Sequence, residues 1–261
     1  MEHPLAPGTR VYIKQSAHGV AYTAAEFFLR LAKQAAAEGQ RFRVALSGGS
    51  TPKMLYELLA SDTNIFRTDV PWGNVDFFFG DERWVPHDHP DSNYKLADDF
   101  LFRPLGIAEV NVYPIRTTGV DSDESARQYE TTLRDVLDTR HDGEVPELDL
   151  VFLGMGDDGH TASLFPGTDV VHDNERLAAA VYVPKLSANR VTLTPLTLNS
   201  AAHVLFMVTG AAKAPALREV LEGTYDPDRF PSQVLRNSLG QVTWLVDKDA
   251  AARLQGRYPQ A

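Results

Sequence analysis

Short apolar runs alternate along this chain with segments of helical periodicity, and this alternation restricts the fold more than any other feature. The runs that predict buried strands lie at residues 42–46, 75–79, 148–153, 190–194, 203–208 and 242–246. Runs that are apolar throughout are typical of strands covered on both faces. The pattern therefore predicts an α/β fold with a mostly parallel, doubly wound, Rossmann-like sheet covered by helices on both faces.

The segments between these runs carry helix signals. Helices are predicted over residues 22–38, from near Pro52, over 93–102, from a capping box at Asp121 to about Leu137, and over 215–222. No linker, repeat or charge block divides the 261 residues, so we predict a single α/β domain over residues 1–261.

Composition and charge exclude several classes of function. The formal net charge is −10, which disfavours nucleic acid as a partner because a phosphate backbone requires a basic face. The chain has no cysteine, so disulfides, thiolate nucleophiles and thiolate metal sites are excluded. The N-terminus lacks an apolar signal region and no stretch approaches 18 apolar residues, which predicts a cytoplasmic protein without membrane contact. The oligomeric state stays open, and a monomer is compatible with the sequence.

Four of the predicted strands run directly into polar loops that contain glycine. The loops read "SGGSTP" after 42–46, "GDER" after 75–79, "GMGDDGH" after 148–153 and "TGAAK" after 203–208. Ligands of open parallel sheets bind outside the carboxyl ends of the strands. If the strands are parallel, the four loops meet at one rim, and we expect the functional site there.

The first loop is suited to a phosphate. Gly48 and Gly49 allow a ligand to approach the backbone closely, Ser50 or Thr51 is expected to cap the helix, and Pro52 fits the first helical position. The N–H groups and positive dipole end of such a helix bind anions. The loop lacks the G-K-[ST] ending of a Walker A motif, and a capped turn without a ligand is the alternative.

Three cations are candidates for the same anion. Arg83 follows its strand and offers a planar fork, Lys213 lies just before the helix expected at Pro215, and Arg190 opens the run at 190–194. The alternatives are an Asp–Arg pair that holds a turn, and solvent exposure. The nearby "HDHPDSN" suggests no metal, because two histidines one residue apart lack a second group of ligands.

His160 is the candidate catalytic base. It follows a buried strand on a turn bracketed by glycines, and Asp157 and Asp158 lie three and two residues before it. Either aspartate could orient the ring and leave its other nitrogen free to accept a proton. No G-x-S-x-G elbow supplies a serine nucleophile, so the base would activate water or move a substrate proton.

Four segments resemble, in the same order, those of the 6-phosphogluconolactonase family. They are "ALSGGSTPKMLYELL", "FFFGDERWVPHDHPDSNYKL", "LVFLGMGDDGHTASLFPG" and "TGAAKAPAL", and the resemblance runs from about residue 20 to 250. It implies hydrolysis of 6-phospho-glucono-δ-lactone to 6-phosphogluconate in the oxidative pentose phosphate pathway, without metal or organic cofactor. It also implies His160 as the base that activates water and Asp158 as its partner. The sugar phosphate would lie among Gly48, Gly49, Ser50, Thr51, Arg83, Lys213 and, with less support, Arg190.

Two other functions remain as alternatives. Glucosamine-6-phosphate deaminases share the fold and a "DGH" segment, but follow it with "IAFNEP", whose glutamate assists the histidine. This chain has Leu164 and Phe165 where the asparagine and glutamate would fall, and Arg83 where the deaminases carry an aromatic residue after "DE". A non-catalytic sugar-phosphate sensor would carry a DNA-binding segment or a degenerate loop, whereas Asp158 and His160 are both present and no basic helix–turn–helix is seen.

Overall fold

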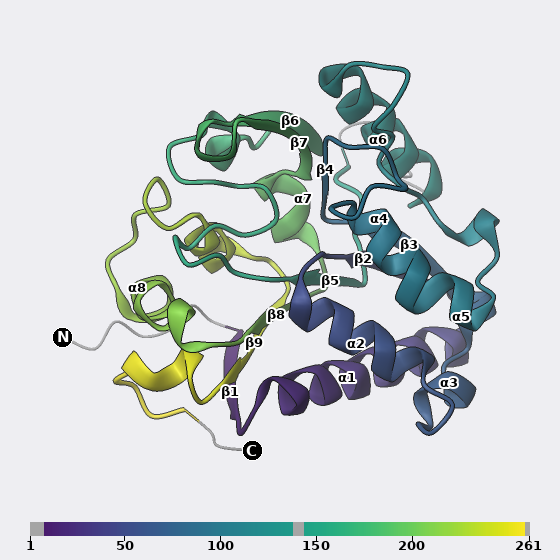
Figure 1. Ribbon diagram of the computed structural model, residues 1–261, viewed down its shortest axis with the longest axis horizontal. Coiled ribbons are helices and arrows are strands. Elements are labelled where there is room, and N and C mark those ends of the chain that lie inside the picture. Colours follow the sequence, from purple (N-terminus) through teal and green to yellow (C-terminus); the bar gives the residue numbers. More distant parts are fainter. Residues whose placement is uncertain (1–7, 138–143, 259–261) are drawn as a thin grey trace.

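The computed structural model describes residues 8–137 and 144–258, which form two β-sheets with helices around them (Figure 1). The larger sheet has six strands in the order β1-β9-β8-β5-β2-β3, and every pair in it is parallel. Its strands are β1 (Thr9–Lys14), β2 (Phe42–Leu46), β3 (Val75–Phe79), β5 (Leu150–Leu153), β8 (His203–Val208) and β9 (Gln241–Asp247). The predicted parallel sheet is confirmed, and five of its strands coincide with predicted runs. The sixth, β1, was not predicted, because only Val11 of its six residues is buried.

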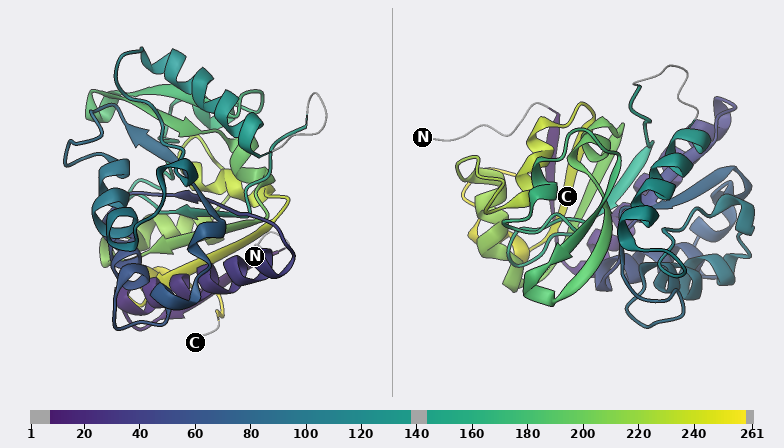
Figure 2. Two further views of the ribbon diagram at one scale, coloured as in Figure 1. Left: turned by 90° about the vertical axis from the view of Figure 1, so that its right-hand side faces the viewer. Right: turned by 90° about the horizontal axis from the view of Figure 1, so that it is seen from above.

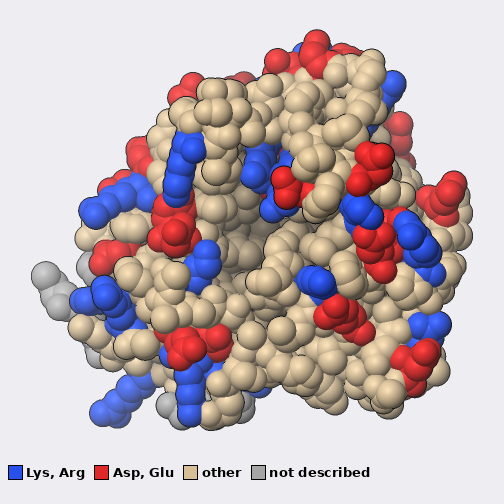
Figure 3. All heavy atoms as spheres, viewed as in Figure 1, with Lys and Arg blue, Asp and Glu red and all other residues tan. Residues whose placement is uncertain are grey.

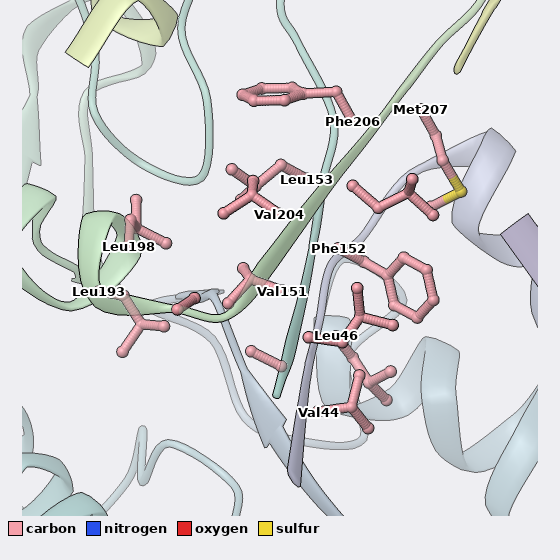
Figure 4. Packing of buried hydrophobic residues seen from close by; sticks show 14 of the residues in the cluster. Val44, Leu46, Val151, Phe152, Leu153, Leu193, Leu198, Val204, Phe206 and Met207 are labelled. Carbon is pink, nitrogen blue, oxygen red and sulfur yellow. The ribbon is translucent and has the colours of Figure 1, made fainter. Parts of the chain in front are cut away.

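Helices cover both faces of this sheet, as predicted. On one face, α1 (Ala17–Ala37) brings Phe28 against the rings of Phe42 and Phe152, at centroid distances of 5.3 and 6.2 Å. On the other face lies α7 (Pro195–Ser200), whose Leu198 is fully buried. Figure 4 shows the alternation along β5: Val151 and Leu153 point towards Leu198, and Phe152 points the opposite way. Figure 2 shows α1 on one side of the large sheet and the smaller sheet on the other.

The smaller sheet is antiparallel and was not predicted. It consists of β4 (Asp81–Arg83), β7 (Ala188–Leu193) and β6 (Ala178–Val183) in the order β4-β7-β6. The "GDER" segment is therefore not a loop but contains a three-residue strand, and the run expected at 190–194 lies in this second sheet. A three-residue strand is too short to show alternation, and the alanines of β6 give a weak strand signal.

Four of the remaining helices fall on segments predicted to be helical: α2 (Ser50–Ala60), α4 (Asn93–Ala97), α6 (Ser122–Val136) and α8 (Ala214–Glu222). The short helices α3 (Phe66–Asp69) and α5 (Arg103–Leu105) were not predicted, and a π-helical stretch joins α4 to α5. The predicted cap of α6 is present, since the Asp121 carboxylate accepts the Glu124 N–H at 2.8 Å. Among the described residues, no helix combines the length and the apolar character needed to cross a bilayer.

Candidate active site

The four polar segments meet at one edge of the large sheet, as predicted. Strands β8, β5, β2 and β3 are consecutive neighbours and all parallel, so their carboxyl ends lie side by side. Figure 3 shows a hollow in the middle of this face of the molecule, with Lys and Arg side chains at its margin. The candidate site is built at this edge.

His160 is held by Asp158 through its ring. Asp158 Oδ1 lies 2.6 Å from Nδ1 of the imidazole and also accepts the His160 backbone N–H at 3.2 Å. A carboxylate only accepts hydrogen bonds, so Nδ1 is the nitrogen that donates, and Nε2 is the nitrogen without a proton whenever the ring is neutral. The side chain is 28% exposed, which leaves the ring accessible from the solvent side. The contact with Asp158 therefore leaves Nε2 as the nitrogen available to a substrate or water molecule.

The glycines of this turn are required by its geometry. The Gly156 N–H donates to the His160 carbonyl at 2.8 Å, which closes the turn and places the ring directly over Gly156. A Cβ at that position would lie 2.0 Å from His160 Nδ1. Gly159 has φ +77°, and a Cβ there would lie 2.9 Å from the Phe230 ring. Only glycine lets the backbone pass this close to the Asp158–His160 pair.

Lys185 is a member of the site that the sequence did not indicate. Its Nζ lies 2.9 Å from Asp158 Oδ2, so the two carboxylate oxygens bind different partners. Burial by itself raises the pKa of Asp158, but the hydrogen bonds from His160 and Lys185 outweigh burial and hold that pKa well below its usual range. Asp158 is therefore ionised, whereas its neighbour Asp157 is exposed and, in the described part of the chain, forms no hydrogen bond with the ring.

Phe165 is a second residue that sequence reasoning missed. Its ring stacks on His160 with a centroid distance of 4.0 Å and an angle of 21° between the planes. The guanidinium carbon of Arg190 lies 5.9 Å from the same ring centroid. Phe165 is thus in contact with the imidazole and within cation–π range of Arg190, which places Arg190 beside the catalytic turn.

Arg83 and Arg190 form a pair across the smaller sheet. They are directly opposite each other in the β4–β7 register, and neither Nε has a hydrogen-bond partner among the described residues. Burial lowers the pKa of Arg190, and the charge of Arg83 adds to this effect. Asp81 Oδ2 lies 3.9 Å from Nη1 of Arg190. Nη1 of Arg83 donates a hydrogen bond to the Asp91 carbonyl at 2.6 Å. Two adjacent guanidinium groups with unused donors form a suitable site for an anion.

Asn93, at the start of α4, joins the Gly48 loop to strand β4. The Asn93 amide donates to the Asp81 carbonyl at 2.8 Å, and Ser163 Oγ lies 2.6 Å from Asp81 Oδ2. A Cβ at Gly48 would lie 1.8 Å from Asn93 Oδ1. Gly48 therefore allows its loop to pack against Asn93, next to the arginine pair.

The start of α2 differs from the prediction in two ways. The helix begins at Ser50 rather than near Pro52, and Gly49 is the N-cap, with φ +113°. Neither Ser50 nor Thr51 caps the helix, because Gly49 turns the chain before either side chain could reach back. Thr51 Oγ1 instead lies 2.8 Å from Thr209 Oγ1, in the loop after β8. The first N–H groups of α2 have no side-chain cap, as an anion site at a helix N-terminus requires.

The structure also places Lys213, a candidate for anion binding, and the segment "HDHPDSN" with its two histidines. Lys213 lies half-buried in the 3₁₀ turn after β8, where its backbone N–H donates to the Gly210 carbonyl at 3.1 Å. Its side chain forms no hydrogen bond or ion pair with another described residue, so it is not joined to the arginine pair. The His87 ring bonds the Ile115 carbonyl and stacks on Tyr94. In the described part of the chain, no group of three or more His, Asp or Glu side chains could hold a metal ion.

The similarity of this chain to known proteins shows its family. Residues 15–244 match the model of the family described as glucosamine-6-phosphate isomerases/6-phosphogluconolactonase. The chain belongs to this family. It is 39% identical over 226 residues to a 6-phosphogluconolactonase of Synechocystis sp., covering 87% of this chain and 90% of the relative. It is 34% identical over 251 residues to 6-phosphogluconolactonase 3, chloroplastic, of Arabidopsis thaliana, covering 94% and 75%. The resemblance drawn from the motifs, and with it the prediction of an enzyme of this family, is confirmed.

Solved structures agree with the family assignment. The 6-phosphogluconolactonase of Trypanosoma cruzi superimposes with a TM-score of 0.84 at 32% identity, covering 97% of this chain and all of that one (100%). A monomeric glucosamine-6-phosphate deaminase has the same fold, with a TM-score of 0.77 at 23% identity. Because both kinds of enzyme adopt this fold, the distinction between them rests on the side chains of the site.

Proposed function

We propose that this enzyme hydrolyses 6-phospho-glucono-δ-lactone to 6-phosphogluconate in the oxidative pentose phosphate pathway, with His160 as general base. The family and the names of the relatives support the lactone as substrate. The observation that supports the mechanism is the 2.6 Å contact between Asp158 Oδ1 and Nδ1, which engages Nδ1 and leaves Nε2 as the nitrogen that can accept a proton. Asp158 is the partner that orients the ring and stabilises its charge after proton transfer.

The reaction then needs one base and no covalent nucleophile. Nε2 of His160 takes a proton from a water molecule while the water oxygen attacks the lactone carbonyl carbon. The carbonyl becomes a tetrahedral oxyanion, which collapses with cleavage of the bond between the carbonyl carbon and the ring oxygen. The imidazolium returns its proton to the leaving oxygen, so the ring opens and the base is regenerated. A positioned base of this kind contributes about 10²–10⁴-fold in rate.

The arginine pair and the start of α2 are the proposed site for the phosphate. Arg83 and Arg190 offer unpartnered guanidinium nitrogens, and the uncapped α2 start contributes the backbone at Gly49, Ser50 and Thr51. Gly48 allows this loop to pack beside the arginines. Lys213 follows the carboxyl end of strand β8, at the same edge of the sheet, where its flexible side chain would reach a bound anion.

The residue after the catalytic turn favours a lactonase over a deaminase. Where the deaminase pattern has its helper glutamate, Phe165 stands here and covers one side of the imidazole. Leu164 beside it is fully buried. The carboxylate bonded to the His160 ring in the described structure is that of Asp158.

The test is a coupled assay with freshly prepared 6-phosphogluconolactone and 6-phosphogluconate dehydrogenase. We expect the wild type to exceed spontaneous hydrolysis, and His160→Ala to lose about 10²-fold or more. His203→Gln is a matched control, because His203 begins β8 at the opposite end of the strand from the site. Parallel samples receive glucosamine 6-phosphate and are assayed for ammonia. Ammonia release without lactone hydrolysis would contradict the proposal, and so would full activity of His160→Ala.

A further inference from the structure

Lys185 is presented to the catalytic turn by the β6–β7 hairpin. It lies in the 3₁₀ turn Pro184–Leu186 that joins β6 to β7, and the two strands remain paired up to Val183 and Ala188. The turn is closed by the Ser187 N–H, which donates to the Pro184 carbonyl at 3.1 Å. Ser187 adopts φ +48°, a left-handed conformation that fixes the direction of the turn. The hairpin thus carries Lys185 at its tip and Arg190 on its second strand.

The hairpin binds the Asp158 carboxylate through the ammonium group of Lys185. Lys185 Nζ is 2.9 Å from Asp158 Oδ2, while Oδ1 receives both the ring and backbone N–H groups of His160. Asp158 is only 22% exposed, whereas the Lys185 side chain is 62% exposed. The carboxylate of Asp158 is therefore bonded on both oxygens, and these bonds set its plane relative to the imidazole.

We propose that Lys185 is a positioning residue for His160 in the reaction proposed above, on which this inference rests. Its ammonium group holds Asp158 so that Oδ1 faces Nδ1. Its positive charge also offsets part of the Asp158 charge, so the ring stays neutral, and able to accept a proton, at lower pH than with Asp158 alone. A neutral ring is the form that can act as a base.

The other charged groups around the ring do not take over this role. The pKa of Lys185 is raised, mainly by its hydrogen bond to Asp158, and the charge of Asp157 on the exposed side of the turn adds to this effect. Arg190 lies beyond the Phe165 ring, and its nearest carboxylate is Asp81 rather than Asp158. Among the described residues, Lys185 is the cation within hydrogen-bond distance of Asp158.

The experiment compares Lys185→Met, Lys185→Arg and a matched control. The control is Lys33→Met on α1. Lys33 also forms an ion pair with an aspartate, with its Nζ 2.7 Å from Asp69 Oδ2, and its side chain is 51% exposed. The first readout is the pH profile of kcat/KM for the lactone. The second is the NMR titration of the His160 ring in the free protein, identified by its loss in His160→Ala. An exposed ion pair has a modest effect, so we expect Lys185→Met to raise both midpoints by about half a pH unit.

Lys185→Arg keeps the charge and is expected to restore the midpoints, and Lys33→Met is expected to leave them unchanged. An unchanged His160 titration in a folded Lys185→Met variant would overturn the inference, even where the wild type hydrolyses the lactone. The NMR readout needs no turnover, so the two proposals fail separately. The wild type could lack lactonase activity while the His160 titration still differs between Lys185→Met and wild type. That result would refute the proposed function and support the electrostatic role of Lys185.

Discussion

Replacing Gly156 by alanine tests whether the glycine turn sets the position of the catalytic ring. The added Cβ would lie 2.0 Å from His160 Nδ1, 2.3 Å from Cε1 and 2.6 Å from Asp158 Oδ1. Ordinary contact begins near 3.4 Å, so the ring has to move by roughly 1.4 Å or the turn has to open. Either change breaks the 2.6 Å contact between Nδ1 and Oδ1.

The expected loss of activity follows from this displacement. A misplacement of about 1 Å at a reacting group costs on the order of 10²-fold in rate, and complete loss of a base costs about 10²–10⁴-fold. We therefore expect kcat/KM of Gly156→Ala to fall by about 10²-fold or more, equivalent to about 2.7 kcal/mol of transition-state stabilisation. Overpacking of the turn should also lower the free energy of unfolding by about 1–3 kcal/mol.

The assay is lactone hydrolysis, with urea unfolding to confirm that the variant is folded. Gly154→Ala is the matched control, because it lies two residues earlier in the same loop and its Cβ would meet no atom within 4 Å. We expect this control to keep close to wild-type kcat/KM. A folded Gly156→Ala variant with kcat/KM within about threefold of wild type would refute the reasoning, since the ring could then move without loss of function.

Other contacts lead to four further predictions. Asp158→Asn should lower kcat/KM by about 10²-fold or more, measured with the lactone. Hydrogen bonds from the imidazole and Lys185 hold the pKa of Asp158 low, so the ionised carboxylate stabilises the fold fully above about pH 5 and less as the pH falls. The difference in unfolding free energy between wild type and Asp158→Asn should therefore shrink in acid. Arg190→Met should raise KM for the phosphorylated lactone by about tenfold or more, and an unchanged KM would exclude Arg190 from the anion site. Tyr129→Phe should destabilise the fold by about 2–4 kcal/mol in urea unfolding, because the buried hydroxyl both accepts the Phe79 N–H and donates to the Phe79 carbonyl.

Much of the fold could be read from local patterns. Five strands of the large sheet, the long helices and the cap at Asp121 agree with the sequence, because apolar runs, helical periodicity and capping residues act over a few positions. The convergence of the four loops also followed, since parallel strands carry their carboxyl ends to one edge. The single domain and the cytoplasmic location stay predictions.

Local sequence patterns could not predict the contacts between segments that are distant in the chain. The pairing of Arg83 with Arg190 depends on the register of β4 with β7, and β4 is too short to be recognised. Lys185 reaches Asp158 only because the β6–β7 hairpin carries it across the rim. Phe165 returns to His160 through a reversal at Ala162, whose φ of +47° no residue-type preference indicates.

The sequence by itself therefore determined the class of fold, the rim of polar segments and the aspartate–histidine turn, because each of these is set by residues close together in the chain. It left Asp157 and Asp158 both open as the partner of His160, and the family resemblance favoured Asp158. Only the tertiary structure decided what surrounds that pair: the lysine on the carboxylate, the aromatic ring on the imidazole and the two opposed arginines. These contacts join segments separated by strands and helices, and their geometry is set by strand register and packing rather than by any local preference.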